Sequence, residues 1–290
     1  MSAKLGAMTL PFRGYSFEQA LDGIAEAGLH YVCLGLPHDG RLVPHPDDSE
    51  AQWQRVIDAC ASRKLLPGMF FCQTHAEHEN GEQVWIKAVR HAAMAGIRYI
   101  LGLGTWSYRD PQNLLAGRKC FHELAAEEDR WVAVMKQVCA EATQCGVIVL
   151  IKPHSGNTAT ALDCRLTLQA VGSSAMAVCY DGGNVRFYEG VDAVADLPLI
   201  ADRVGALCLK DHRGPRLHSD FPPPGEGRVD HAGMFRILQQ AGFAGPMFIE
   251  RVDGEEDAAR MDYREIVARL TRSVQMIKRA AGEAKLPLTT

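Results

Sequence analysis

Seven polar or ionisable residues fall at the ends of apolar runs in the second half of the chain. They are Lys152, His154, Asp181, Asn184, Lys210, His212 and Glu250. Lysine and histidine beside carboxylates can take a proton from a carbon next to a carbonyl group and hold the oxygen anion that forms. Because charged groups are rarely buried without partners, the convergence of these residues would indicate a functional site rather than solvated strand ends.

The apolar runs that carry these residues belong to a set of eight. Each run is short and rich in apolar and β-branched residues, as expected of a strand that is buried on both faces. Amphipathic, helix-like stretches lie between the runs, for example at 16–28, 49–63, 82–96 and 127–146. The predicted strands span residues 5–10, 31–36, 66–71, 99–104, 147–152, 176–181, 205–210 and 246–251.

Signals at the expected helix boundaries support this alternation. Ser16 with Gln19, and Ser49 with Gln52, have the spacing of a capping box at a helix start. Glycines that can adopt the left-handed C-terminal cap precede several of the strands, namely Gly28, Gly96, Gly146 and Gly242.

Strands that alternate with helices predict an α/β fold, a single (β/α)8 TIM barrel over roughly residues 5–282. We expect one domain, residues 1–290, because no repeat or low-complexity linker divides the chain. The alternative is an open doubly wound sheet. However, the first strand is not followed by a glycine-rich phosphate loop, and Gly102-x-Gly104 lacks a third glycine. We therefore expect no nucleotide cofactor.

Composition indicates a small-molecule substrate. The net charge of −4, from 31 basic and 35 acidic residues, gives no attraction for nucleic acid or an anionic membrane. The nine cysteines form no C-x-x-C pair and several fall inside apolar runs, which favours reduced thiols in a cytoplasmic protein. We expect neither secretion nor membrane insertion, because no suitable apolar run occurs. The sequence leaves a homo-oligomer open.

In a barrel of this kind the active site lies at the carboxyl ends of the strands, and residues two apart on a strand share one face. We therefore expect Lys152 and His154 on the fifth strand, and Lys210 and His212 on the seventh, to face the mouth. Asp211 is expected to lie on the other face.

Loops at the same end are expected to contact the substrate. The stretch 105–126 is unusually long for a barrel connection and is predicted to cover the mouth as a mobile wall, with Trp106 stacking on a sugar face. Arg213 and Arg216, after the seventh strand, can grip a phosphate or carboxylate group. Asn184 is a further candidate for substrate binding.

Several segments resemble the second half of xylose-isomerase-like barrel proteins, the sugar phosphate isomerase and epimerase superfamily: IKPHSG, YDGGN, LKDH, PPGEGRVDHAGMFRIL and FAGPMFIER. The opening stretch TLPFRGYSFEQALDGIAEAGLHYVCLGL is similar to that superfamily's first strand and helix. The most specific piece is P-G-E-G-x-V-D, from Pro224 to Asp230, followed by G-x-x-G-P-x-x-I-E, which ends at Glu250. The resemblance covers nearly the whole chain and implies a barrel enzyme that acts on a sugar.

The resemblance also implies one divalent metal, held by Glu, Asp, His and Glu on the fifth to eighth strands. Asp181 and Glu250 match two of these ligands, whereas Lys152 stands at the first Glu position and Cys208 at the His position. Two interpretations stay open. In one, Lys152 supplies the positive charge that a metal would have supplied. In the other, a divalent ion such as Mn, Mg or Zn is bound slightly higher in the mouth by His154, Asp181, His212 and Glu250.

The reaction favoured by this set of residues is isomerisation or epimerisation of a sugar by proton transfer next to its carbonyl group. His154 and Glu250 are the candidate acid and base, and Lys152, Lys210 or a metal is the candidate electrophile. Two alternatives remain. A lyase would take the same first step on an oxidised (3-keto) glycoside and then expel a leaving group. A sugar-binding barrel without catalysis would explain the two missing family ligands.

Overall fold

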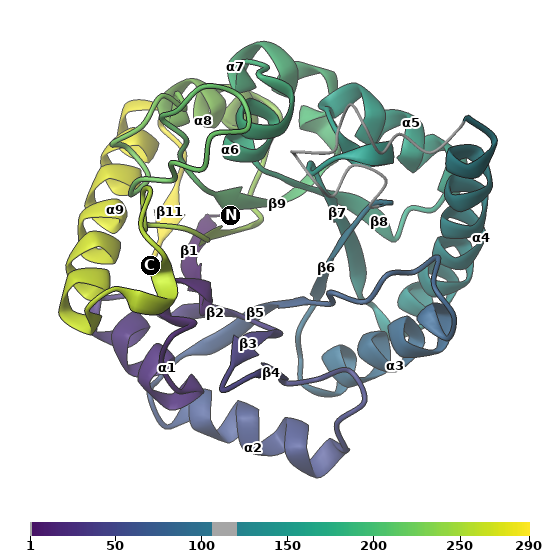
Figure 1. Cartoon of the computed structure of the whole chain (residues 1–290), viewed down its shortest axis with the longest axis horizontal. Helices are drawn as coiled ribbons and strands as arrows, with labels where there is room; N and C mark the ends of the chain where they lie inside the picture. Colours follow the sequence, from purple (N-terminus) through teal and green to yellow (C-terminus); the bar gives the residue numbers. More distant parts are fainter. Residues whose placement is uncertain (1, 106–120) are drawn as a thin grey trace.

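The computed structural model describes residues 2–105 and 121–290. Its centre is a closed ring of parallel strands, because the last barrel strand pairs with the first. Helices form an outer ring around these strands (Figure 1). In ring order the strands are β1 (Ala3–Met8), β2 (Tyr31–Leu34), β5 (Leu66–Phe71), β6 (Tyr99–Leu103), β7 (Ile148–Lys152), β8 (Met176–Tyr180), β9 (Val204–Leu209) and β10 (Pro246–Ile249). The predicted (β/α)8 barrel is confirmed.

The helices begin and end largely where the sequence signals predict. Ser16 and Ser49 each form a complete capping box with the glutamine three residues later. The predicted cap glycines all adopt a left-handed backbone, with φ between 69° and 78°. The main helices are α1 (Phe17–Glu26), α2 (Glu50–Ala61), α3 (Gly81–Met94), α4 (Phe121–Cys145), α5 (Ala161–Val171), α7 (Ala193–Asp196), α8 (His231–Gln240) and α9 (Tyr263–Glu283).

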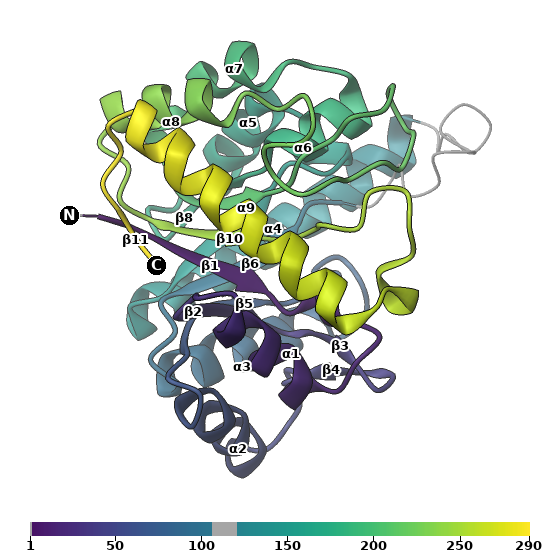
Figure 2. The ribbon, with the colours of Figure 1, turned by 90° about the vertical axis from the view of Figure 1, so that its left-hand side faces the viewer.

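Two elements are absent from the sequence prediction. The predicted second strand, 31–36, ends early at Leu34, and an antiparallel hairpin that the sequence did not indicate follows it, β3 (Leu36–His38) and β4 (Arg41–Val43). A short strand, β11 (Leu288–Thr289), extends the sheet beside β1. Figure 2 shows the two chain termini at one end of the barrel and the β3–β4 hairpin at the other. The hairpin therefore lies at the end where the strands finish.

The sequence predicts a loop over residues 105–126. Its predicted carboxyl-terminal boundary is wrong, because α4 already begins at Phe121. Helix α4 starts six residues before the predicted 127, so the connection after β6 is shorter than expected. The rest of that connection, residues 106–120, lies outside the described residues, as does the predicted role of Trp106 in stacking on a sugar. Within the described residues, no helix is long and apolar enough to cross a membrane.

The interior of the barrel is packed with methionine, cysteine and aromatic side chains. Cys33, Cys179 and Cys208 are all buried in this interior, and none forms a disulfide. Phe248 on β10 lies 3.0 Å from the position that a Cβ on Gly68 of β5 would take, so the ring spans the barrel. Because this layer fills the barrel, polar groups can gather only above it, at the ends of the strands.

Candidate functional site

Four neighbouring strands deliver charged groups to one rim of the barrel. Lys152 is the last residue of β7, while Asp181, Lys210 and Glu250 directly follow β8, β9 and β10. Because these strands are parallel and adjacent, their carboxyl ends meet at the same place. A cavity of about 370 Å³ opens there, and we call it the barrel-mouth cavity. It is lined by both lysines and Glu250, together with His154, Asn184 and Tyr188.

The charged groups form a compact buried network. Lys152 Nζ lies 2.8 Å from both carboxylate oxygens of Glu250 and 3.0 Å from Asp181 Oδ2. Lys210 Nζ lies 2.8 Å from Glu250 Oε2 and 3.4 Å from Asp181 Oδ2. All four residues are at most 6% exposed. Two ammonium groups thus face two carboxylates, and the network is neutral overall, which is what makes its burial tolerable.

The protonation states in this network follow from burial opposed by charge. Burial disfavours the charged form of Lys152, but the carboxylates of Glu250 and Asp181 outweigh this and raise the pKa of Lys152 well above its usual range. Burial likewise opposes the charge of Lys210, whose pKa is nevertheless raised by Asp181 and Glu250. Burial would raise the pKa of Glu250, yet Lys152 and Lys210 hold that pKa well below its usual range. Both lysines are therefore cations and Glu250 is a carboxylate near neutral pH.

Cys208 adds a neutral donor to the same cluster. Its Sγ donates to Glu250 Oε2 at 3.0 Å and lies 3.4 Å from Lys152 Nζ. Burial, together with Asp181 and Glu250, raises the pKa of the Cys208 thiol well above its usual range. The side chain that stands at the family's histidine position is thus a thiol rather than a thiolate. The carboxylates alone carry the negative charge that Lys152 faces.

The fit of a metal ion to this cluster depends on which groups are considered. Asp181, Cys208 and Glu250 offer ligand atoms that all lie within 4.8 Å of one another, so by type and spacing they could hold a metal. However, the Lys152 ammonium contacts all three of these groups. A divalent ion placed between them would meet the buried positive charge of Lys152. With the Lys152 ammonium in place, the cluster therefore does not fit a metal ion.

His154 lies at the edge of the barrel-mouth cavity and is held by Tyr188. The Tyr188 hydroxyl lies 2.9 Å from His154 Nε2, and the two rings are 4.5 Å apart between centroids. Asn184 donates from Nδ2 to the carbonyl of Pro153 at 2.6 Å, and its own N–H donates to Asp181 Oδ1 at 2.8 Å. These bonds fix the two segments that follow β7 and β8 against each other, with an imidazole facing the cavity.

Asp211 points away from the mouth, as predicted, and organises the loop that carries the P-G-E-G-x-V-D motif. Its carboxylate accepts N–H bonds from Gly225, Gly227 and Val229 at 2.9–3.0 Å. A Cβ on Gly227 would lie 2.1 Å from Asp211 Oδ1, so this close approach requires glycine. The motif is therefore a structural anchor that sets the loop after β9 relative to Lys210.

The structure does not bring His212 into the cluster with Asp181 and Glu250. Its Nε2 lies 2.8 Å from the carbonyl of His218, and its ring packs at 5.5 Å from both Phe187 and Phe221. The expectation that His212 would share a face with Lys210 assumed a continuing strand. Because β9 ends at Leu209, the alternation of side chains no longer applies at His212, three residues further on. Within the described residues, no group of metal-ligand spacing combines His154 or His212 with the carboxylates.

Arg213 and Arg216 also lie outside the barrel-mouth cavity. Arg213 forms a bidentate ion pair with Asp220 at 2.8 and 3.0 Å. Arg216 donates from Nε to the carbonyl of Tyr188 at 2.5 Å. Both arginines line a neighbouring cavity instead. The structure therefore places these two arginines in the neighbouring cavity and not in the barrel-mouth cavity.

Three side chains of the site were missed by the sequence interpretation. They are Tyr188, Phe221 and Arg251. Tyr188 holds His154, and Phe221 forms an aromatic wall that the cations of Arg251 and Lys210 approach to 4.4 and 5.3 Å from its ring centroid. Arg251 directly follows Glu250 in the closing motif, so its proximity to the mouth could have been inferred. Tyr188 and Phe221 lie in irregular segments, and no periodic pattern marks them.

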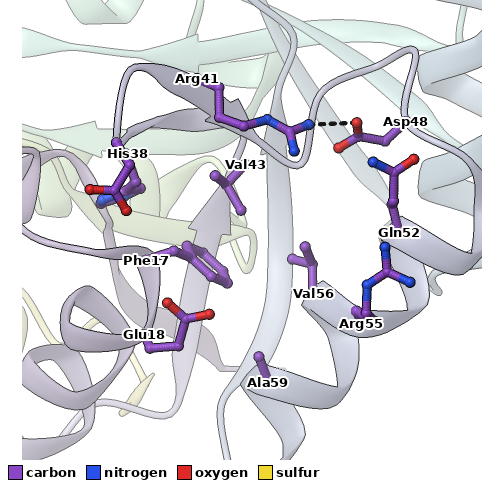
Figure 3. A pocket seen from close by; sticks show the side chains of 11 residues that line it. Phe17, Glu18, His38, Arg41, Val43, Asp48, Gln52, Arg55, Val56 and Ala59 are labelled. Carbon is purple, nitrogen blue, oxygen red and sulfur yellow. Dashed lines mark hydrogen bonds and ion pairs between the residues drawn. The ribbon is translucent and has the colours of Figure 1, made fainter.

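A different cavity lies outside the ring of strands, between α1, the β3–β4 hairpin and α2 (Figure 3). Phe17, Val43 and Val56 form its apolar side, and Arg41 pairs with Asp48 across its rim at 2.5 Å. Its charges are mixed and largely exposed, and none of the strand-end groups lines it. The chemistry suited to a reaction is therefore at the barrel mouth.

The histidines after β5 form a separate group. His75, Glu77 and His78 offer ligand atoms within 4.8 Å of one another, and the two imidazole rings are stacked with centroids 4.3 Å apart. His75 Nδ1 lies 3.4 Å from Glu77 Oε1, and the neighbouring imidazoles contribute to holding the pKa of Glu77 below its usual value against the effect of burial. In the described part of the chain, no hydrogen bond or ion pair joins His75, Glu77 or His78 to the lysine–carboxylate network.

Comparison with known proteins identifies the family of the chain and supports its barrel fold. Residues 21–273 match the model of a family described as xylose isomerase-like TIM barrel. No curated protein matches the chain in sequence. A D-psicose 3-epimerase from Clostridium cellulolyticum H10, solved with D-tagatose, superposes with a TM-score of 0.75 at 13% identity, covering 96% of this chain and 99% of that one.

Two further solved structures resemble the chain. A D-allulose 3-epimerase from Methylomonas sp., in complex with D-allulose, gives a TM-score of 0.72 at 17% identity, covering 96% of this chain and 97% of that one. A 3-keto-D-glucoside 4-epimerase from E. coli gives 0.68 at 16% identity, covering 93% of this chain and 100% of that one. At these identities the likeness shows a shared fold.

Proposed function

Since the chain belongs to the xylose isomerase-like TIM barrel family, we propose that it is a sugar isomerase or epimerase that moves a proton next to the carbonyl group of its substrate. The observation that carries this proposal is the buried network in which Lys152 and Lys210 face Asp181 and Glu250 beside the imidazole of His154. The sugar epimerases that share the fold support the substrate class.

In the proposed reaction, His154 takes the proton from the carbon next to the carbonyl group. The electron pair of that C–H bond moves into the carbonyl, and the oxygen becomes an enediolate anion. An ammonium group of Lys210 or Lys152 stabilises this oxygen, since both lysines line the cavity as cations. Return of a proton to the same or the neighbouring carbon gives the epimer or the isomer.

Glu250 is better suited to holding the lysines than to acting as the base. Its carboxylate is bound by both ammonium groups, and they keep its pKa well below the usual range. A carboxylate with so low a pKa is a weak acceptor for a carbon-bound proton. We therefore assign the base to His154 and assign to Glu250 and Asp181 the role of positioning the two cations.

We further propose that Lys152 takes the place of the metal that the family's ligand pattern implies. Its ammonium lies among Asp181, Cys208 and Glu250, the groups that would otherwise have to bind the ion. A fixed ammonium can stabilise an enediolate oxygen electrostatically without a bound ion. On this proposal, catalysis should be indifferent to chelators.

The test is proton exchange on a panel of ketoses and keto-glycosides. The protein is incubated with each sugar in D2O, and NMR follows the appearance of deuterium next to the carbonyl group and of an epimer or isomer. We expect exchange and product with at least one sugar, and loss of both in His154→Gln. Exposed His30, on the segment before β2, offers a matched control as His30→Gln. Saturable binding of a sugar without exchange would contradict the proposal and indicate a sugar-binding barrel.

A lyase acting on a 3-keto glycoside is the second candidate, because it needs the same base and the same cations. The Tyr188 hydroxyl and the Lys210 ammonium are additional proton donors at the cavity that could protonate a leaving oxygen. The same panel separates the two reactions. Release of an aglycone, with loss of the glycoside, identifies the lyase, whereas a change of configuration without release identifies the epimerase.

A further inference from the structure

A second cavity lies beside the barrel mouth and has a wall dominated by arginine. Its volume is about 450 Å³, and it is formed by the segments that follow β8 and β9. Glycine and proline supply the rest of its lining, so no carboxylate side chain of the described residues lines it. We call it the arginine cavity, after its four cationic residues, Arg186, Arg213, Arg216 and Arg228.

The positive charge of this cavity is only half compensated. Arg213 is paired with Asp220 at 2.8 Å, and Arg216 approaches Glu189 at 3.5 Å. In the part of the chain that the structure describes, Arg186 and Arg228 form no ion pair. Four arginines less two carboxylates leave a charge of +2 around the arginine cavity. Like charges gathered in this way repel one another, so an anion between them would relieve the repulsion.

Arg186 carries the most direct sign of a missing partner. Its Nε is buried from solvent and has no hydrogen-bond acceptor among the described residues. A buried guanidinium nitrogen without an acceptor is costly, because it loses its bond to water without gaining another. The positive charge of Arg186 also acts on His212. Burial lowers the pKa of His212, and repulsion by Arg186 contributes to lowering it further.

We propose that the arginine cavity binds a phosphate group. A phosphate dianion carries a charge of about −1.5 to −2 near neutral pH, which matches the uncompensated charge. Its oxygens accept paired N–H bonds from guanidinium groups, and arginine is the residue best shaped for such bidentate contacts. This assignment concerns a binding site and stands whether or not the proposed reaction is correct.

The arginine cavity shares a wall with the barrel mouth. Phe187 and Tyr188 line the barrel-mouth cavity, whereas Arg186, the residue before them, lines the arginine cavity. Tyr188 joins the two sides, since its hydroxyl lies 2.9 Å from His154 Nε2 and its carbonyl accepts the Nε–H of Arg216 at 2.5 Å. The phosphate could therefore be an ester on the sugar substrate or belong to a separate small molecule.

The test measures phosphate binding without turnover. Inorganic phosphate is titrated into the wild type at low ionic strength by isothermal calorimetry, and then into Arg186→Met and Arg228→Met. We expect saturable binding by the wild type and a loss of affinity of about tenfold or more in each variant. The matched control is Arg279→Met, which removes one exposed arginine from α9 and should leave the affinity unchanged.

Arg228 is exposed and its variant should fold normally, so the test does not depend on how Arg186→Met behaves. Absence of saturable phosphate binding by the wild type would overturn the proposal, as would equal weakening in Arg279→Met. A second titration distinguishes the two possible sources of the phosphate group, the sugar substrate and a separate small molecule. Competition between inorganic phosphate and a ketose phosphate indicates the substrate's own ester, whereas simultaneous binding of inorganic phosphate and an unphosphorylated ketose indicates a separate ligand.

Discussion

Replacing Lys152 by methionine removes the ammonium at the centre of the site while keeping much of the side-chain length. The ammonium lies 2.8 Å from both Glu250 oxygens and 3.0 Å from Asp181 Oδ2. At an effective dielectric constant of about 20, one such contact represents roughly 6 kcal/mol of attraction before desolvation is counted. Removing one partner of a buried ion pair costs about 3–5 kcal/mol net. Because Lys210 still faces both carboxylates, we expect a decrease of about 3 kcal/mol in the free energy of unfolding.

The same variant should lose activity by more than its loss of stability explains. If Lys152 stabilises the enediolate oxygen or fixes Lys210 to do so, turnover should fall about 100- to 1000-fold while the barrel remains folded. Turnover is measured on the sugar identified from the panel, and unfolding is followed in urea. Lys87→Met is the matched control, because Lys87 forms an exposed ion pair with Asp47 at 2.7 Å. Its stability should change by less than about 1 kcal/mol, and its turnover should not change.

Lys152→Glu restores the ligand that the family pattern places on the fifth strand. We expect this variant to gain affinity for Mn²⁺ or Zn²⁺, since three carboxylates and a thiol would then surround one point, and we expect the wild type to keep its turnover in chelator. Calorimetry and metal analysis measure the first effect. Near-normal turnover in Lys152→Met, or loss of wild-type turnover in chelator, would refute the assignment of Lys152 as the functional cation.

Three further predictions follow from the geometry. His154→Gln should keep sugar binding but lose deuterium exchange, which calorimetry and NMR can separate; retained exchange would remove the imidazole from the role of base. Gly227→Ala should cost about 1–3 kcal/mol of unfolding free energy, because its Cβ would lie 2.1 Å from Asp211 Oδ1, whereas Gly282→Ala, with open space around it, should not destabilise. The lowered pKa of Glu250 means that its contribution to stability is present above its unfolded pKa of about 4.3 and is lost as the pH falls through the folded value. The pKa values of the two lysines are raised, so their contribution is present below about pH 10.4 and is lost as the pH rises through their folded values. The difference in unfolding free energy between the wild type and Lys152→Met, measured across pH, should therefore show a plateau between these limits; loss of that difference near neutral pH would contradict these assignments.

The sequence by itself determined the barrel and the end at which its site lies. Strands buried on both faces must be apolar along their whole length, so eight such runs were visible without any contact information. Capping boxes and cap glycines are local devices, and those at Ser16, Ser49 and Gly28 occur where the sequence places them. Asp181 and Glu250 could be placed at the same rim from the sequence, because each lies at the end of a predicted strand and parallel strands in a closed barrel all finish at one rim.

Tertiary structure decided which polar groups meet. Alternation predicts the face of a side chain only while the strand continues, and β9 ends before His212, so that residue turns toward Phe187 and Phe221 instead of the carboxylates. The arginine cavity likewise depends on the path of two irregular segments, which no periodic pattern specifies. The sequence shows that Lys152 stands where the family's ligand pattern has a metal-binding glutamate. Only the packed barrel brings its ammonium within 3.0 Å of both Asp181 and Glu250, because that contact requires three strands, far apart in sequence, to end at the same point.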